Sequence, residues 1–430
     1  MNLNKKSGGG ENFSLRDMLM NGKQLSFSNR MNAFSHFISD ITANQQNFYM
    51  RQVTSAADRE VEIIDPFTKH KKRMLMFGSN NYLGLANHPY VREQVKKAID
   101  KFGVGIGGPP LLNGYTNQYR ELEEQLALLK HTEDSLLFSS GYAANVGLVS
   151  ALINHGDKVL YDEYSHASFC DGLRMAKADA ISFKHNDMKE FETLLNQKNN
   201  SSEDIFVGVE GVYSMDGDLA PLDKVTSLCK KNKAILIMDD AHGTGVLGDT
   251  GSGTAEHFGV GDMVDITMGT FSKTFGVSGG FVSASKPIIN YLRYFARSHM
   301  FSASLPPVVI AAVLAGLEII KKEPALLKKL NENAKYASTG LKKLGFNINP
   351  QSAILALPVP ETMNIREAAY HFHKTGIFVN SIEYPAVPLN QQRFRISLMA
   401  THTKDDIDYL LSVTEEVWAF YNKEINLKAC

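Results

Sequence analysis

The chain has 430 residues, with 45 Lys and Arg against 46 Asp and Glu, so its formal net charge is -1. No overall field therefore recruits nucleic acid or a membrane, and any such partner would need a local site. The 43% hydrophobic content is enough for a large core, and the length predicts two or three domains. Three widely spaced cysteines, Cys170, Cys229 and Cys430, predict free thiols in a reducing, cytoplasmic compartment.

Residues 1–76 are predicted to form three segments outside the main domain. The first ten residues hold a glycine run and no signal-sequence core, so we expect a disordered tail. Apolar residues then recur at helical spacing and predict an amphipathic helix: Phe27, Met31, Phe34, Ile38 and Ile41. This helix would pack on the protein or on a second subunit, or alternatively touch a membrane surface, although its polar face is not notably basic. Two apolar alternations around Asp65-Pro66 predict a hairpin at 59–77.

Residues 77–307 alternate short apolar runs with helical patterns. We expect strands at 135–138, 158–161, 205–209, 234–238, 263–268 and 280–283, and helices that include 90–102, 122–130 and 143–154. Such alternation predicts an α/β domain with a mainly parallel sheet and helices on both faces. After Pro306-Pro307 the pattern becomes helix-rich, with strands expected at 353–357 and 394–398, so residues 308–430 are predicted to form a smaller α+β domain.

Lys273 and Asp239 follow two of the predicted strands. Lys273 comes after strand 263–268 among small residues and glycines, although its spacing alone also fits a solvated loop lysine. Asp239 ends strand 234–238 and is followed by Asp240 and His242. Because the carboxyl ends of parallel strands meet at one edge of a sheet, these groups should lie together. A carboxylate for the pyridinium nitrogen and an amine for the aldehyde are what pyridoxal 5'-phosphate needs.

Other polar residues are expected in the same strand-end layer. Gly141 lies in a strand–turn–helix stretch whose free backbone amides would hold a phosphate. His166 follows a strand, and its ring could stack on a cofactor ring, although a lone histidine is more often structural. Ser214 offers a hydroxyl group. Arg393 and Arg395 share one face of a strand, where they form either a surface ladder of charges or a site for a substrate carboxylate.

Together these residues resemble the α-oxoamine synthases, which are fold-type I enzymes that depend on pyridoxal phosphate. Members include 8-amino-7-oxononanoate synthase, 2-amino-3-ketobutyrate ligase, 5-aminolevulinate synthase and serine palmitoyltransferase. The similarity runs from Ser-Asn-Asn-Tyr-Leu-Gly-Leu at 79–85 to Arg-Ile-Ser-Leu-Met-Ala at 395–400. The resemblance implies the fold-type I architecture and a homodimer with active sites at the subunit interface.

The resemblance also implies a role for each matched residue. Lys273 matches the Schiff-base lysine, and Asp239 matches the partner of the pyridinium nitrogen. His166 matches the histidine that stacks on the ring, and His242 and Ser214 match the groups near the ring hydroxyl. The phosphate contacts are matched by Thr270 and the Gly141-Tyr142 turn. On the substrate side, His166 also helps to hold the amino-acid carboxylate. Asn80 matches a substrate-side asparagine, and Arg395, rather than Arg393, matches the carboxylate arginine.

The implied reaction is a decarboxylative Claisen condensation of an α-amino acid with an acyl thioester, carried by coenzyme A or a carrier protein, to give an α-amino ketone. The stretch 103–115 is stiffened by Pro109 and Pro110 and made apolar by Leu111 and Leu112, and Ala303 stands where a threonine from the neighbouring subunit often binds phosphate. These departures favour a long acyl chain with serine or cysteate. In contrast, the stretch 239–248 is closer to oxononanoate synthases, so a short-chain reaction stays open.

Two other classes of function remain. A fold-type I aminotransferase would also use Lys273 and Asp239, although the histidine pair and the stretch Ser-Met-Asp-Gly-Asp at 214–218 argue against it. A non-catalytic subunit that regulates a catalytic partner would be expected to lack the lysine, so Lys273 argues against that interpretation too.

Overall fold

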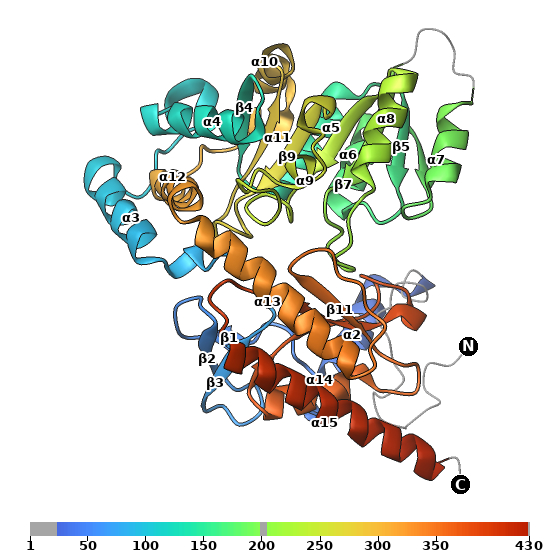
Figure 1. Ribbon diagram of the computed structural model, residues 1–430. Helices are drawn as coiled ribbons and strands as arrows, with labels where there is room; N and C mark the ends of the chain where they lie inside the picture. The colour runs from blue at the N-terminus through green and yellow to red at the C-terminus, as the bar shows by residue number, and fades with distance from the viewer. Residues whose placement is uncertain (1–23, 198–203, 429–430) are drawn as a thin grey trace.

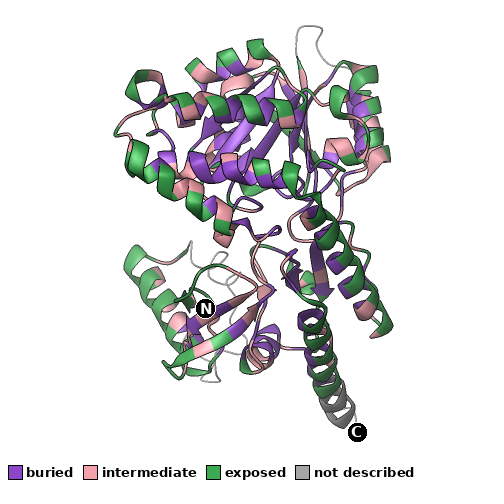
Figure 2. Ribbon diagram, turned by 60° about the vertical axis from the view of Figure 1, so that its left-hand side comes forward, coloured by how far each residue is buried: buried purple, intermediate pink, exposed green. Residues whose placement is uncertain are grey.

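The computed structural model describes residues 24–197 and 204–428, so the predicted disordered tail and Cys430 lie outside the described residues. A seven-stranded sheet with its helices forms a large lobe, and two smaller sheets form a small lobe beneath it in Figure 1. Figure 2 shows the large sheet buried between helical layers. The described chain has no helix long and apolar enough to cross a membrane.

The large sheet has the order β4-β10-β9-β8-β7-β5-β6. Its strands are β4 (Asp134–Phe138), β5 (Lys158–Asp162), β6 (Asp179–Phe183), β7 (Ile205–Glu210), β8 (Ile235–Asp239), β9 (Ile266–Thr270) and β10 (Gly280–Ala284). β10 is antiparallel to β4 and β9, whereas the other pairs are parallel. The predicted mainly parallel sheet is therefore confirmed.

Helices cover both faces of this sheet, as the sequence predicted. One face contacts α5 (Gly141–Leu152), α6 (Ala167–Ala176), α10 (Lys286–Phe295) and α11 (Arg297–Met300), and the other contacts α4 (Asn117–Lys130), α7 (Met188–Leu195) and α8 (Leu222–Asn232). Neighbouring strand residues alternate between the two apolar cores, as the period of two requires: Leu136 and Phe138 belong to one core and Leu137 to the other. The short α9 (Thr254–His257) and the 3-10 turns Leu85–Asn87, Gly261–Met263 and Leu389–Gln391 complete the connections, with a π-helical turn at Pro110–Gly114.

Two details of the sheet differ from prediction. The strand expected at 263–268 begins later, because residues 261–263 form a 3-10 turn and the Asp265 carboxylate accepts the backbone N–H of Leu236. β6 was not predicted. It is an edge strand whose first four residues are exposed, so it has no apolar run that would mark it.

The small lobe joins the two ends of the chain. One sheet has the order β1-β2-β3-β12 and the other β11-β14-β13. Their strands are β1 (Gln52–Val53), β2 (Glu60–Ile64), β3 (Lys71–Met76), β11 (Ile354–Pro358), β12 (Ile377–Phe378), β13 (Asn380–Ile382) and β14 (Arg393–Ser397). β2 and β3 form the hairpin expected from the sequence, and β3 then pairs in parallel with β12 from the far end of the chain. The segments 1–76 and 308–430 are thus connected by one sheet, and their division into separate domains stays a prediction.

Long helices link the lobes. α12 (Pro307–Lys322) packs against α3 (Pro89–Phe102) and α4 of the large lobe, although it lies in the segment predicted to belong to the small domain. α13 (Pro324–Lys343) then crosses into the small lobe, where α14 (Ile365–Lys374) and α15 (Lys404–Lys428) accompany it (Figure 1).

The predicted amphipathic helix is present as α2 (Phe27–Ala43), capped by the Ser26 side chain. Its buried side chains are Phe37 and Ile41, whereas Phe27, at 72% exposure, and Met31 and Phe34 face outward. The helix therefore packs on the chain through Phe37 and Ile41, and packing of its exposed apolar side chains on a second subunit stays a prediction. Nothing in the described residues supports membrane contact by this helix.

Candidate active site

The carboxyl ends of the parallel strands bring the predicted groups into one layer. Asp239 ends β8, Glu210 is its register partner at the end of β7, and Thr270 ends β9 shortly before Lys273. Burial lowers the pKa of the Lys273 amine to about 8, against the opposing effect of the Asp239 and Glu210 carboxylates. Lys273 is thus a half-buried amine beside two carboxyl groups, and the solvated-loop interpretation is wrong.

The Asp239 carboxylate is held in place from two sides. Its Oδ2 accepts a hydrogen bond of 2.8 Å from Asn145 Nδ2, and its Oδ1 accepts one of 3.0 Å from the backbone N–H of Ala241. Asn145 lies on α5 and donates a second hydrogen bond to Ser168 Oγ. One amide group therefore fixes Asp239 relative to the start of α6.

His166 precedes α6, and its ring belongs to the same network. His166 Nδ1 lies 2.7 Å from Ser168 Oγ and accepts the backbone N–H of Ser168, which assigns the ring proton of the neutral form to Nε2. Burial lowers the pKa of His166, although Asp239 acts in the opposite direction. The ring opens on a large pocket, so its flat face is available for contact with a ligand.

His242 is buried behind this layer. Its Nδ1 lies 2.8 Å from the hydroxyl group of Tyr82, and burial, together with the positive charge of Lys273, holds its pKa well below the usual value. His242 is therefore a neutral side chain held in a fixed orientation. Asn80, two residues before Tyr82, accepts hydrogen bonds from Arg395 Nη1 at 3.0 Å and from the Tyr82 hydroxyl at 3.3 Å.

The two arginines of β14 are both buried and face the site, so the surface-ladder interpretation is wrong. Arg393 pairs with Asp216. Arg395 donates from Nε to the Ser214 carbonyl at 2.5 Å and from Nη1 to Asn80 and Ser397. In the part of the chain that the structure describes, its buried Nη2 has no hydrogen-bond partner. Such an unsatisfied guanidinium nitrogen is expected to bind an acceptor on a ligand.

A possible phosphate cradle lies where α5 begins. Ser140 caps the helix by accepting the Ala143 N–H, which leaves the amides of Gly141 and Tyr142 at the positively polarised end. A Cβ atom on Gly141 would lie 2.9 Å from the Thr270 Cβ, so glycine permits this close approach. The Tyr142 hydroxyl donates to Asp171, so its side chain is directed toward α6.

Three residues of this site were not predicted: Tyr82, Asn145 and Glu210. Tyr82 lies in the stretch 79–85 on which the family resemblance rests, and Glu210 directly follows the predicted strand 205–209. Neither side chain could be assigned to the site from the sequence, because its buried surroundings are formed only by the complete fold. Glu210 is buried, and desolvation with the neighbouring Asp239 charge raises its pKa well above the usual value.

Comparison with known proteins identifies the family. Residues 72–413 match the model of aminotransferase class I and II. The chain is 39% identical to 8-amino-7-oxononanoate synthase of Thermoanaerobacter pseudethanolicus, over 83% of this chain and 89% of that protein. It is also 39% identical to serine palmitoyltransferase of Sphingobacterium spiritivorum, over 91% of this chain and 96% of that protein. The solved structure of serine palmitoyltransferase from S. paucimobilis, with PLP and myriocin bound, superposes with a TM-score of 0.85 at 30% identity, covering 93% of this chain and 100% of that one.

The chain belongs to the class I and II aminotransferase family. Within it, the chain is an α-oxoamine synthase, a PLP-dependent C-acyltransferase of fold-type I. The residues present fit this cofactor, because the Gly141 cradle suits a phosphate, Asp239 is held rigidly, and Lys273 supplies an amine with a lowered pKa. The roles of individual residues remain proposals, and they are given below.

We expect the Lys273 amine of the cofactor-free protein to titrate near pH 8, compared with about 10.4 for an ordinary lysine. Since only the neutral amine is acylated, labelling of Lys273 by acetic anhydride should rise through pH 8, as followed by mass spectrometry. Asp239→Asn removes a carboxylate that favours the charged amine, so it should move the midpoint below that of the native protein. A midpoint near 10 in the native protein would contradict the burial argument.

Proposed function

We propose that this enzyme condenses a small amino acid, serine or cysteate, with a long-chain acyl thioester. A bond forms between the amino-acid Cα and the thioester carbonyl carbon. The C–S bond breaks to release the thiol, and the Cα–carboxylate bond breaks to release CO2, so that an α-amino ketone remains. The observation that carries the long-chain assignment is the pocket beside His166 and Ser214.

This pocket has a volume of about 1080 Å³, at the upper limit of the range of about 300–1,000 Å³ that is usual for small-molecule sites. It extends from the strand-end layer toward the small lobe. Apolar and aromatic side chains supply much of its wall: Tyr164, Met215, Tyr384, Pro385, Ala386, Val387 and Pro388. A long hydrocarbon chain fits such a wall because its burial needs no polar partners.

The charges of the same pocket disfavour an acyl chain that ends in a second carboxylate, such as pimeloyl. Two arginines line it, and both are paired: Arg174 with Asp171 and Arg393 with Asp216. Glu163 adds a further negative charge to the wall. Among the described residues of the wall, no unpaired arginine is left for a terminal carboxylate, whereas an uncharged chain end has no such need.

In this proposal each site residue has one task. PLP supplies the electron sink that stabilises a carbanion at Cα. Lys273 holds the cofactor and moves the Cα proton, for which an amine with a pKa of about 8 is suited near neutral pH. Asp239 holds the pyridinium nitrogen, and Arg395 Nη2 with His166 takes the amino-acid carboxylate.

The remaining assignments concern the cofactor's ring and phosphate and the support of Arg395. Ser214 and the neutral His242 lie near the ring hydroxyl, and the Gly141-Tyr142 turn with Thr270 holds the phosphate. Asn80 orients Arg395 through the hydrogen bond described above.

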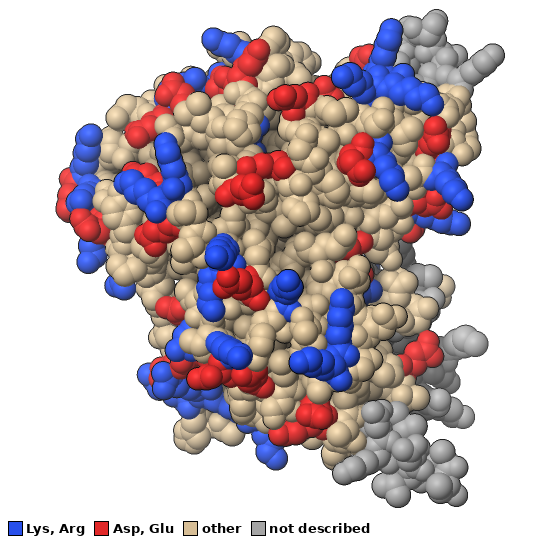
Figure 3. All heavy atoms as spheres, viewed as in Figure 1, with Lys and Arg blue, Asp and Glu red and all other residues tan. Residues whose placement is uncertain are grey.

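We also propose that two copies form a homodimer, working in the cytoplasm. The 103–115 stretch lies against α11, and Ser304, which follows α11, donates hydrogen bonds to the carbonyl groups of Gly108 and Gly114. Exposed apolar side chains lie on these two segments. Val104, Leu112 and Phe301 are 74%, 80% and 70% exposed, which is unusual for large apolar residues. In contrast, acidic and basic side chains are interspersed over the face in Figure 3. A second copy would bury this apolar region beside the site.

Arg395→Gln should raise the dissociation constant for the amino acid by about 10- to 100-fold, because a charge-assisted hydrogen bond is lost. The measurement is a titration of the cofactor absorbance band before any thioester is added. Arg395→Lys keeps the charge, so its dissociation constant for the amino acid should lie between those of the native protein and Arg395→Gln. Arg393→Lys, which keeps the pair with Asp216, serves as the matched control. If the Arg393 and Arg395 variants raised the dissociation constant equally, the assignment of the carboxylate to Arg395 would be rejected.

A panel of acyl-CoA substrates tests the chain length. The kcat/KM, measured as CO2 release, is expected to rise with the length of the acyl chain, because each further CH2 group that the pocket buries adds favourable free energy. Met215→Trp narrows the pocket and should lower kcat/KM for long chains about tenfold while leaving amino-acid binding unchanged. Met215→Leu, which nearly conserves volume, is the control. Preference for pimeloyl-CoA or acetyl-CoA would overturn the lipid proposal, and keto-acid formation without thioester would favour the aminotransferase.

Leu112→Glu together with Phe301→Glu should shift the protein from twice the chain mass to the chain mass in sedimentation velocity, because charges would be buried at the interface. The control is Met50→Glu, at a side chain that is 99% exposed on the small lobe. A native protein that sediments as a monomer at micromolar concentration would refute the dimer.

A further inference from the structure

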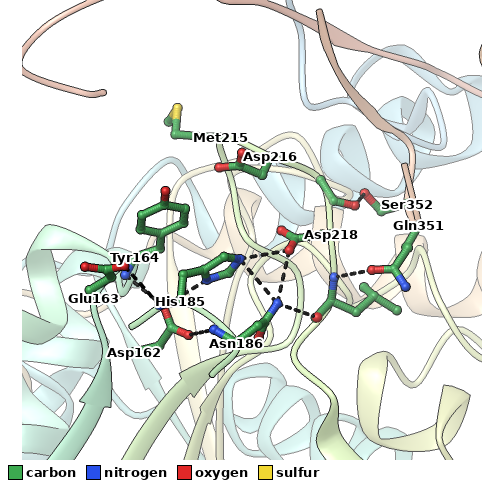
Figure 4. Close-up of polar contacts among 12 residues, drawn as sticks. Asp162, Glu163, Tyr164, His185, Asn186, Met215, Asp216, Asp218, Gln351 and Ser352 are labelled. Carbon is green, nitrogen blue, oxygen red and sulfur yellow. Dashed lines mark hydrogen bonds and ion pairs between the residues drawn. The ribbon is translucent and has the colours of Figure 1, made fainter. Parts of the chain in front are cut away.

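A histidine outside the predicted site lies between two carboxylates. His185 Nδ1 is 3.0 Å from Asp162 Oδ1, and Nε2 is 2.8 Å from Asp218 Oδ2 (Figure 4). The ring stacks on Tyr164 with centroids 4.2 Å apart and meets Tyr213 edge-on at 4.4 Å. Asp162, His185 and Asp218 are called the His185 bridge below.

Both ring nitrogens face carboxylate oxygens, so the geometry requires a proton on each nitrogen. A neutral imidazole would turn a lone pair toward one carboxylate, whereas the imidazolium donates to both. Burial alone lowers the pKa of His185, but hydrogen bonds and charges from Asp162 and Asp218 outweigh it and raise the pKa to about 10. Glu163 adds a third acidic group beside this residue, because its carboxylate accepts the backbone N–H of His185.

On one side, the bridge fixes the segment that leads to His166. Asp162 ends β5, and its two carboxylate oxygens accept the N–H groups of Tyr164 and Asn186. Its carbonyl group accepts the N–H of Ser165. The position of Asp162 therefore determines how the chain turns toward His166.

On the other side, the bridge holds the segment 213–219, which contains Ser214. Asp218 accepts from His185 and Asn186, and Asn186 also donates to the Leu219 carbonyl. The small lobe bonds to the opposite side of the same segment. Ser352 donates to the Gly217 carbonyl, and Gln351 accepts the Leu219 N–H (Figure 4).

The same segment contacts both arginines of β14. Arg395 Nε donates to the Ser214 carbonyl, and Arg393 pairs with Asp216 and donates to the Met215 carbonyl at 3.3 Å. The large lobe thus bonds to the segment 213–219 at Asp218 and at the Leu219 carbonyl. The small lobe bonds to it at residues 214–217 and at the Leu219 N–H. Asp218 and the Ser214 carbonyl, which accepts from Arg395 Nε, thus belong to one hydrogen-bonded segment.

We propose that His185 is a positioning residue for the amino-acid substrate: as an imidazolium it fixes the segment that orients Arg395 and, at the same time, the segment that carries His166. This inference rests on the proposed carboxylate site of Arg395 and His166. Without the cation, Asp162 and Asp218 would repel each other and the two segments would separate.

The variant His185→Gln removes the cation, and His155→Gln, at an exposed turn, is the matched control. The measurements use the cofactor-loaded enzyme at pH 7.5. His185→Gln should raise the dissociation constant and KM for the amino acid about tenfold and change kcat less than threefold. Adding Asp218→Asn to His185→Gln removes the uncompensated carboxylate and should restore most of the binding. The positioning role would be overturned if kcat fell by as large a factor as KM rose, or if the double variant did not recover amino-acid binding.

Deuterium exchange of the protein without amino acid tests the bridge independently of the reaction. His185→Gln should speed exchange of the backbone amides in 213–219, including that of Leu219, at least about tenfold relative to His155→Gln. If exchange stays native while amino-acid binding falls, the bridge proposal is wrong although the proposed function stands. If exchange accelerates but no amino acid binds even to the native enzyme, the proposed function and with it the substrate-positioning role fail.

The pH dependence of stability gives a further check. The folded-state pKa of His185, about 10, exceeds the unfolded value of about 6.5, so its stabilisation is full below pH 6.5 and is lost as pH rises through 10. The difference in free energy of unfolding between the native protein and His185→Gln should therefore shrink steadily between these values in urea titrations. A difference that does not depend on pH would show that the ring is uncharged and would overturn the bridge.

Discussion

The whole site depends on an electrostatic constraint at the carboxyl edge of the sheet. In-register pairing of β7 with β8 places Glu210 beside Asp239, in a layer where water is scarce and Lys273 is the nearest amine. Two adjacent carboxylates cannot both stay charged there at low cost. Asp239 receives hydrogen bonds from Asn145 and the Ala241 amide. Burial and the neighbouring Asp239 charge raise the pKa of Glu210 well above its usual value, although the Lys273 charge and backbone hydrogen bonds from His166 and Ser214 act in the opposite direction.

The sequence could predict this layer because strand-end position depends on local pattern. The apolar runs before Asp239 and Lys273 mark buried parallel strands, and the topology of such sheets then brings the following residues together. β6 has no such run, because its side chains at the sheet edge are mostly exposed. For α2, periodicity predicts the helix and its apolar stripe but does not show which side of that stripe meets the protein.

Residues that act through tertiary contacts were beyond sequence reasoning. Asn145 is a mid-helix amide, and its importance comes only from reaching both Asp239 and Ser168. His185 is likewise an ordinary histidine after an unpredicted strand, and its partners lie 23 and 33 positions away in the sequence. The chemistry of each is set by neighbours that only the complete sheet brings within hydrogen-bond distance.

Arg393 and Arg395 show how surroundings separate two identical side chains. They are two residues apart on β14, and both are buried on the face toward the site. Arg393 meets the carboxylate of Asp216, so its charge is compensated within the protein. Among the described residues, Arg395 donates to a carbonyl, an amide oxygen and a hydroxyl group, all of which are uncharged. These acceptors fix the guanidinium in direction without neutralising it, and a buried cation held in this way is strongly biased to bind an anion. Under the proposed function, the small lobe would supply the charge that binds the substrate carboxylate, and the large lobe would supply Lys273 and Asp239, which act on the cofactor.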